Sequence, residues 1–236
     1  MTAPLLYLAH RVPYPPDKGD RIRNWNVLRF LARRRPVWLA CLADEPVPDE
    51  TRRVLEATCE RVAIVPVGGG RWISALGSLA RGGSISEGAF SSSELRRILD
   101  EWAKATSFGV AVVSASSLVP YLRRPNLRQV PAIVDLVDVD SQKWFDYAAA
   151  SSFPKSLLYR LEGSRLRRLE RELPTWTRAV MVVSAAETDL YRQFAAPGNV
   201  MTVTNGVDLD YFQPRESELD DACTFVGALD YRPNID

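Results

Sequence analysis

The chain has 236 residues, 46% of them apolar and 25% charged, and its 30 basic residues almost balance 29 acidic ones. This composition is typical of a globular protein with a sizeable core, and the near-zero net charge excludes a global attraction to nucleic acid. Three cysteines, odd in number and widely spaced, argue against a disulfide framework and a paired zinc motif, and they indicate a reducing compartment.

We expect neither a signal peptide nor a membrane-spanning segment. The apolar run at 5–9 is too short for a signal peptide and has no basic region before it. Other segments also fall short of the roughly 20 apolar residues that cross a bilayer. The sequence therefore predicts a cytoplasmic protein that lies at most on a membrane surface.

Short apolar runs alternate with longer segments of helical period along most of the chain. Strand, helix, strand, helix is the pattern of a parallel α/β sheet, so we predict a doubly wound, Rossmann-like fold. Seven strands are expected, at residues 5–9, 37–42, 62–67, 110–114, 132–137, 180–183 and 200–203.

The carboxyl-terminal part predicts a change of domain. Residues 1–208 are expected to form one domain, and residues 209–222 are polar, acidic and suited to a linker. An apolar run at 223–226 then resembles the first strand of a second domain within residues 223–236. Because a lone strand needs a partner, we expect the chain to be the amino-terminal part of a larger protein.

The loop at 10–23, between the first strand and its helix, is the most informative segment. Ligands bind at the carboxyl ends of strands in doubly wound sheets. Gly19 precedes a helix start, and Lys18, Arg21 and Arg23 add positive charge, so a diphosphate could bind there. The alternative is a proline-stiffened turn with a basic helix start. Neither a dinucleotide fingerprint nor a P-loop is present, and the glycines at 68–70 favour a flexible loop over a phosphate cradle.

A second polar cluster follows the fifth expected strand. In an extended chain Asp138 and Asp140 share a face, where a carboxylate could bind sugar hydroxyls or accept a proton. The alternative is that Asp140 or Ser141 caps the next helix. His10 is the only histidine and ends the first strand, so it is interpreted either as a ligand contact or as a structural hydrogen-bonding group.

The leucine- and arginine-rich segment 155–173 predicts a long amphipathic helix. Two interpretations stay open. Its basic residues could lie against anionic lipid, or its leucines could form a core-facing stripe with a solvated back.

Five ordered motifs resemble one family, the sugar transferases associated with the PEP-CTERM/exosortase exopolysaccharide system, within the retaining GT-B glycosyltransferases (glycosyltransferase family 4-like). The motifs are HRVPYPPDKGDR, VDVDSQKW, VVSAAE, TNGVD and FVGALDYRPN, and they lie at 10–21, 137–144, 182–187, 204–208 and 225–234. The resemblance spans essentially the whole chain.

The resemblance implies a two-domain enzyme whose cleft holds an acceptor on the first domain and most of a nucleotide-sugar donor on the second. The nucleotide sugar is a co-substrate, and neither a cofactor nor a metal is implied. Residues 205–208 would form a hinge and residues 227–234 the donor-side loop. The candidate residues are Asp138 and Asp140 for catalysis, Lys18, Gly19, Asp20 and Arg23 for the donor diphosphate, and His10, Ser141, Asn205 and Gly206 for the substrate cleft.

The chain departs from the family in two ways. The Glu-x7-Glu region that grips the donor is missing, and so is the histidine often found in the middle of the first domain. We therefore predict an exopolysaccharide glycosyltransferase fragment, acting on a saccharide or lipid-linked acceptor with peripheral contact to the anionic inner membrane, that has no turnover alone. The rivals are a non-catalytic module that binds an acceptor or a partner protein, and a nucleotide-dependent oxidoreductase, which the missing dinucleotide fingerprint disfavours.

Overall fold

The structure, a computed structural model, describes residues 2–213, apart from the side chains of Arg71 and Trp72. The chain divides into two units, Met1–Asn205 and Gly206–Asp236. In the described part of the second unit, the carboxylate of Asp208 accepts hydrogen bonds from the backbone N–H groups of Asp210 and Tyr211 at 3.0 and 3.1 Å. The predicted strand at 223–226, the donor-side loop and most of the predicted linker lie outside the described residues.

Seven strands occur where the sequence predicts them, with bounds that differ by at most one residue. They are β1 (Leu5–Ala9), β2 (Val37–Ala43), β3 (Arg61–Pro66), β4 (Val110–Ser114), β5 (Ala132–Val137), β6 (Ala179–Val182) and β7 (Val200–Thr202). The helices between them are α1 (Gly19–Ala32), α2 (Asp49–Thr58), α3 (Arg71–Ala80), α4 (Ile85–Ala89), α5 (Ser93–Ala105), the 3-10 turn η1 (Ser116–Leu118), α6 (Val119–Leu122), α7 (Asp140–Ala149), α8 (Lys155–Trp176) and α9 (Ala185–Arg192).

The strands form one parallel sheet in the order β3-β2-β1-β4-β5-β6-β7. Leu6 of β1 pairs with Trp38 of β2 on one side and with Ala111 of β4 on the other. The chain builds outward from β1 to β3 and then crosses to β4, so the order reverses between β1 and β4. A crevice opens at the carboxyl ends of the strands at such a point, and ligands bind there in this class of fold.

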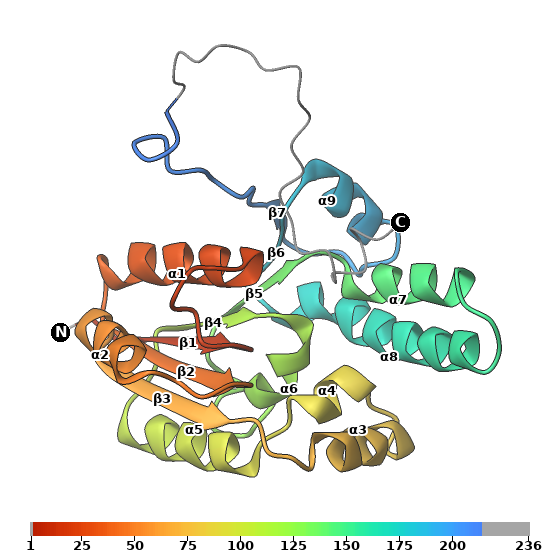
Figure 1. Cartoon of the computed structure of the whole chain (residues 1–236), viewed down its shortest axis with the longest axis horizontal. Helices are drawn as coiled ribbons and strands as arrows, with labels where there is room; N and C mark the ends of the chain where they lie inside the picture. The colour runs from red at the N-terminus through yellow and green to blue at the C-terminus, as the bar shows by residue number, and fades with distance from the viewer. Residues whose placement is uncertain (1, 214–236) are drawn as a thin grey trace. The chain divides into compact units, whose positions relative to one another are not determined.

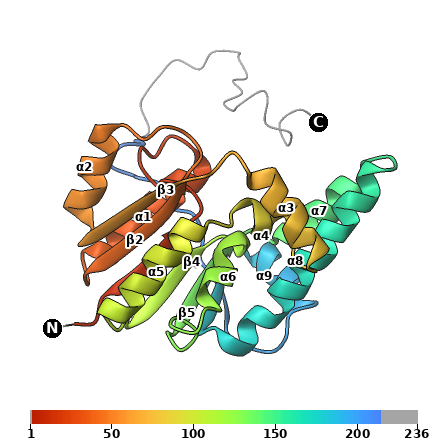
Figure 2. The same cartoon turned by 90° about the horizontal axis from the view of Figure 1, so that it is seen from below.

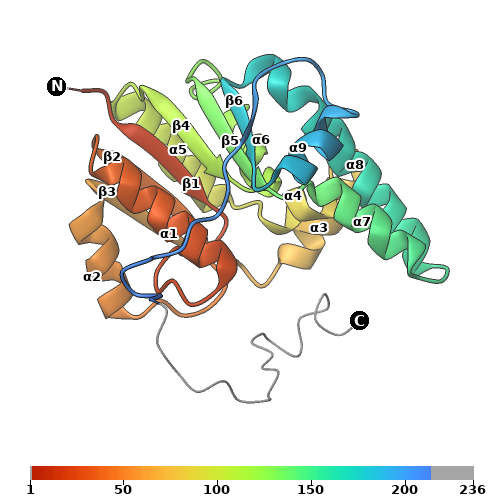
Figure 3. The same ribbon diagram turned by 90° about the horizontal axis from the view of Figure 1, so that it is seen from above.

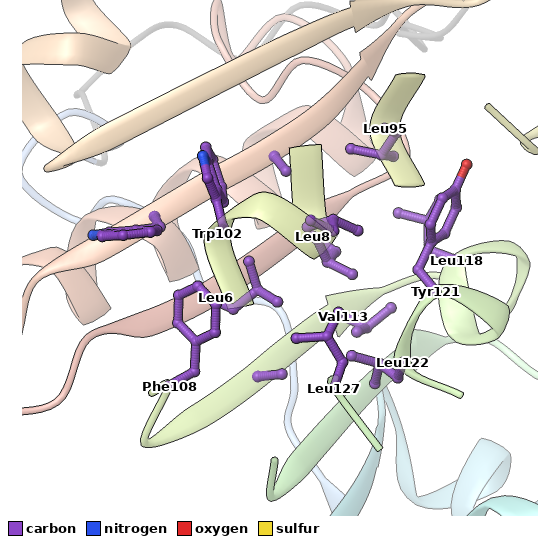
Figure 4. Close-up of a cluster of buried hydrophobic side chains, with 14 of the residues drawn as sticks. Leu6, Leu8, Leu95, Trp102, Phe108, Val113, Leu118, Tyr121, Leu122 and Leu127 are labelled. Carbon is purple, nitrogen blue, oxygen red and sulfur yellow. The ribbon is translucent and has the colours of Figure 1, made fainter. Parts of the chain in front are cut away.

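Helices cover both faces of the sheet (Figure 1). Because side chains alternate along a strand, Leu6 and Leu8 of β1 point to one face, whereas Leu5 and Tyr7 point to the other. The first face packs on α5 and α6, with Leu95, Trp102, Phe108 and Tyr121 among the buried side chains (Figures 2 and 4). The second packs on α1 and α2, which are seen in Figure 3.

A third cluster lies under β5 and β6, where Leu169 and Leu173 of α8 pack against Val134 and Val180. Within residues 2–213, no helix is both long enough and apolar enough to cross a membrane.

Candidate functional site

The carboxyl ends of β1, β4 and β5 bring three polar groups to the crevice. His10 follows β1, Ser116 lies just after β4, and Asp140 begins α7 after β5. The Ser116 hydroxyl donates a hydrogen bond to Asp140 Oδ2 at 2.5 Å. The turn after β4 is tight, with φ of 88° at Ala115, and it directs the chain from the sheet into η1.

His10 is held by a carboxylate. Its Nε2 lies 3.4 Å from Asp20 Oδ2, and the same oxygen accepts a hydrogen bond from Arg11 Nη1 at 3.2 Å. The hydrogen bond with His10, and then its charge and that of Arg11, hold the pKa of Asp20 far below its usual range against an opposing effect of burial. Asp20 is therefore a charged group that orients an imidazole. Because Nε2 faces Asp20, Nδ1 is the ring nitrogen left to accept a proton from a substrate hydroxyl.

The other ring nitrogen of His10 is buried. Nδ1 has no hydrogen-bond partner among the described residues, and the ring meets Phe90 edge to face, with centroids 5.9 Å apart. His10 lies at the end of β1 and contacts Asp20, and its contact with a substrate stays a prediction.

Lys18 and Gly19 stand at the start of α1, as the diphosphate hypothesis requires. The N-cap residue of this 14-residue helix, Lys18, makes no side-chain cap hydrogen bond, and Asp20 is the acid in the first turn. Lys18 is exposed and has no acidic partner within residues 2–213, and open space surrounds the position of a Cβ on Gly19. Binding of a diphosphate here stays a prediction. Asp20, grouped with these residues from the sequence, is instead engaged with His10.

Arg23 does not face the crevice. Its side chain is buried, and Nε and Nη2 donate to the two oxygens of Asp135 at 2.8 and 3.0 Å. Nη1 donates to the Val203 carbonyl and to Asn205 Oδ1, both at 2.9 Å. The guanidinium therefore links α1 to β5 and to the segment that follows β7. We assign Arg23 a structural role in place of diphosphate binding. Asn205 is one of its partners, whereas Gly206 belongs to the second unit.

Asp138 and Asp140 do not share a face. Val137 has a φ of 65°, so the extended backbone on which their alternation rests is broken just before Asp138. Asp138 is exposed, whereas Asp140 is half-buried at the first turn of α7. Burial raises the pKa of Asp140, with the hydrogen bond from Ser116 acting in the opposite direction.

Ser141 is fully buried. Its N–H donates to Glu170 Oε1 at 3.0 Å, its hydroxyl donates to Glu170 Oε2, and Arg167 Nε donates to that hydroxyl at 2.7 Å. Neither Asp140 nor Ser141 caps α7, because the N-cap position is Val139, whose N–H donates to Glu187 at 2.7 Å. The placement of Ser141 in a substrate cleft is therefore corrected.

A pocket of about 330 Å³ adjoins this crevice at the ends of β2 and β3. The sequence predicts a flexible loop for the glycines at 68–70. The three serines at 91–93 carry a helix-cap signal, and Ser92 is the N-cap of α5. Phe90 lines the pocket and also contacts His10. The lining residues are Leu42, Pro66, Val67, Gly68, Gly70, Ser74, Ala89, Phe90, Ser91, Ser92, Ser93 and Glu94.

The pocket combines an aromatic ring, several hydroxyl groups and one carboxylate. Hydroxyls both donate and accept hydrogen bonds, and a carboxylate accepts them, so the lining can satisfy a polar, uncharged ligand rich in hydroxyl groups. Apolar walls next to a few polar groups are also typical of small-molecule sites.

No protein-family model matches the sequence, and no curated protein matches it significantly. Solved structures do resemble the fold. One is UGT2 of Phytolacca americana complexed with UDP-2-fluoro-glucose and pterostilbene, with a TM-score of 0.51, 12% identity, and coverage of 86% of this chain and 54% of that chain. Another is TcCGT1 in complex with UDP, with a TM-score of 0.49, 10% identity, and coverage of 94% and 54%.

The chain therefore spans about half the length of the solved structures that it resembles. These neighbours are GT-B glycosyltransferases, and at 12% identity the likeness to UGT2 shows the fold. The predicted fold class, a doubly wound parallel α/β sheet of the Rossmann-like kind found in GT-B enzymes, is confirmed.

Proposed function

We propose that this chain is the acceptor-side half of a glycosyltransferase that moves a sugar from a nucleotide-sugar donor to a saccharide or lipid-linked acceptor. The observation that carries the proposal is the pairing of His10 with Asp20 at the end of β1, beside a pocket that shares Phe90 with it. The GT-B type of fold supports it. The motif resemblance adds the setting, which is exopolysaccharide synthesis of the PEP-CTERM/exosortase type at the cytoplasmic face of the inner membrane.

Each part of the site has a role in this proposal. The pocket holds the acceptor, His10 accepts the proton of its attacking hydroxyl, and Asp20 keeps the imidazole oriented. Lys18 and the N-terminus of α1 bind the donor diphosphate through positive charge and backbone N–H groups. Asp138, exposed at the end of β5, contacts sugar hydroxyls. No metal or cofactor is required, because these groups neutralise the leaving diphosphate.

Sugar transfer can either retain or invert the configuration at the anomeric carbon of the donor sugar. The motif resemblance implies retention of the anomeric configuration. A general base beside the acceptor suits direct displacement with inversion, as carboxylate bases do in inverting glycosidases. The anomeric configuration of the product, read from its proton NMR coupling constant, decides between them.

In the proposed domain organisation, residues 1–208 form the acceptor domain, residues 209–222 a linker and residues 223–236 the start of a donor domain. We expect the 236-residue chain to show no turnover alone, because most donor contacts would come from that second domain. A UDP-release assay with UDP-glucose tests this, and sugar transfer by the chain alone would contradict it.

Binding tests the proposal without turnover. Gly68 lines the pocket and Gly69 does not, and neither position has atoms within 4 Å of an added Cβ. Gly68→Leu should fill the pocket and weaken saccharide binding at least about tenfold, since an occupied site loses its ligand contacts. Gly69→Leu is the matched control. Saturation-transfer NMR with mono- and disaccharide methyl glycosides measures both, and equal binding by the two variants would remove the pocket from the acceptor site.

The second candidate is a module that binds a saccharide or a partner protein without chemistry. It is favoured by the pocket lying entirely within residues 42–94 of the first unit. Saccharide binding with no detectable binding of UDP-glucose to either the chain or a longer natural form would support this module. Binding of neither ligand would contradict both functions.

A further inference from the structure

Helices α7 and α8 form an antiparallel hairpin that extends from the rest of the first unit (Figures 1 to 3). The two helices are closely packed: a Cβ on Gly163 of α8 would lie 2.9 Å from the ring of Phe145 of α7. Ser141 of α7 and Glu170 of α8 join them near the sheet. The two helices are therefore packed tightly against each other. The outer surface of the hairpin does not take part in this packing.

The outer end of the hairpin exposes large apolar side chains. We define the hairpin tip as residues 143–161. Phe153, in the connecting loop, is 79% exposed, and the first two turns of α8 expose Leu157 (61%), Leu158 (42%) and Leu161 (37%). Four adjacent large apolar groups on one end of a helix pair form a contiguous patch, and such patches mark contacts with a protein or a membrane.

Aromatic rings with polar ends lie beside the leucines. Trp144 is 5.4 Å from Tyr159 and 5.9 Å from Tyr147 between ring centroids, and the two tyrosines are 6.1 Å apart. All three side chains are half-buried. Tryptophan and tyrosine have an apolar ring and a polar group, and they are enriched at the boundary between lipid and water.

The charges of the tip are mainly basic. Lys143, Lys155 and Arg160 are exposed, and Asp146 is the exposed acid among the tip residues. The acid that follows on α8, Glu162, is fully buried and binds the backbone N–H groups at the start of α4. A leucine patch edged with basic residues matches an anionic lipid surface, since each basic residue near that surface strengthens binding by about 1 kcal/mol.

Helix α3 also exposes large apolar side chains. Arg165 of α8 donates to the Gly82 carbonyl just after α3 at 2.8 Å. On α3, Ile73 is 78% exposed and Leu76 is 66% exposed. Exposed apolar groups therefore occur on both elements, and the hairpin tip combines them with the exposed basic residues and aromatic rings described above.

We propose that the hairpin tip docks on an anionic lipid bilayer. The leucines and Phe153 enter the region between headgroups and acyl chains, the aromatic rings lie at the headgroups, and Lys143, Lys155 and Arg160 bind lipid phosphates. This assignment refines the two interpretations of segment 155–173. Leu166 and Leu169 are buried core residues, so only the first turns of the helix contact lipid. The inference stands independently of sugar transfer.

Vesicle sedimentation of the whole chain tests the proposal. Phosphatidylcholine vesicles that contain phosphatidylglycerol should bind the chain, pure phosphatidylcholine much less, and added salt should weaken binding. Lys155→Gln with Arg160→Gln should weaken binding about 25-fold, at roughly fivefold per charge. Leu157→Ser with Leu161→Ser should weaken it about tenfold or more, because each leucine loses burial in lipid.

Exposed residues elsewhere supply the controls. Phe30→Ser on α1 removes an exposed apolar group, and Arg53→Gln with Arg128→Gln removes two exposed charges. These variants should bind as the wild type does, and circular dichroism should show that all variants are folded. If the wild type ignores anionic vesicles, or if the tip variants bind as the controls do, the proposal is overturned. A dimer that the leucine variants dissociate, together with absent vesicle binding, would assign the patch to self-association.

Discussion

Helices α1 and α8 are both rich in arginine, but they place their charges in opposite ways. Helix α1 buries Arg21 against Asp17 and Glu45, and Arg23 against Asp135. Helix α8 buries two of its three acids, with Glu162 at the start of α4 and Glu170 against Ser141, and exposes Arg160, Arg168 and Arg171.

The difference arises from partners supplied by other elements. A buried charge is stable only when it is paired and hydrogen-bonded. Asp135 lies 112 residues from Arg23, and the N–H groups that Glu162 binds lie 76 and 77 residues away. Arg21 and Arg23 of α1 therefore bind acids of other segments, whereas the arginines at 160, 168 and 171 of α8 stay at the surface, and in the proposed docking only Arg160 of these three contacts lipid.

The largest effect on stability is expected from breaking the buried ion pair between Arg23 of α1 and Asp135. Asp135→Ala leaves the Arg23 guanidinium buried without its carboxylate, which should lower the free energy of unfolding by about 3–5 kcal/mol. Urea denaturation measures this. The double variant Arg23→Met with Asp135→Leu should recover much of the stability, since no charge stays buried. A loss below about 1 kcal/mol in the single variant would show that the pair is not a structural tie.

The pH dependence of the free energy of unfolding tests the burial of Glu170 on α8. Burial raises the pKa of Glu170 from 4.5 to about 7, with the bonds from Ser141 opposing the change. Between these values the folded protein binds more protons at this site than the unfolded chain, so this contribution falls as pH rises.

Glu170→Gln removes that dependence. The stability difference between Glu170→Gln and wild type should grow in favour of the variant by up to about 3 kcal/mol from pH 4.5 to 7.5. Thermal and urea unfolding across this range measure the difference. A constant difference would mean that folding leaves the pKa of Glu170 unchanged.

Glu162 compares a buried acid with an exposed one on the same helix. Glu162→Ala leaves the N–H groups of Ile85 and Ser86 without their acceptor and should cost about 1–3 kcal/mol. Glu172→Ala, which removes an exposed ion pair with Arg123, should cost at most about 1 kcal/mol. Equal losses in urea denaturation would contradict the role of Glu162 as the acceptor for the first N–H groups of α4.

The smallest effect is expected on the outer face of α8. Arg168→Gln should change the free energy of unfolding by no more than about 0.5 kcal/mol, because the side chain is exposed and lies away from the buried pairs. Arg23→Gln provides the contrast, since it leaves Asp135 buried without its cation. A large loss from Arg168→Gln would show that the basic face of α8 has a structural role.

The sheet could be predicted from the sequence because short, strongly apolar runs such as those of β1 and β4 leave little choice of structure once helices alternate with them. The location of His10 at the crevice followed from its place at a strand end. Side-chain direction could not be predicted in the same way. Arg23 and Lys18 lie in one basic segment, yet only contacts from β5 and the chain after β7 show that Arg23 turns inward.

Two further features depend on backbone geometry and tertiary packing. The positive φ of Val137 separates Asp138 from Asp140, and a valine gives no sequence signal of that conformation. The pocket forms where the glycines after β3 meet the serines before α5. Each stretch alone is typical of a loop or a helix cap, so neither predicts a binding site until the fold brings them together.

The most direct test of the central claim uses the fact that the chain contains one histidine. The ring carbon and proton signals of His10 in a heteronuclear NMR spectrum are therefore unambiguous. We predict that these signals shift on titration with saccharide methyl glycosides, and shift further with UDP-glucose, because His10 lies between the pocket and the start of α1. Unchanged His10 signals at saturating concentrations of both ligands would contradict the assignment of this crevice as the sugar-transfer site.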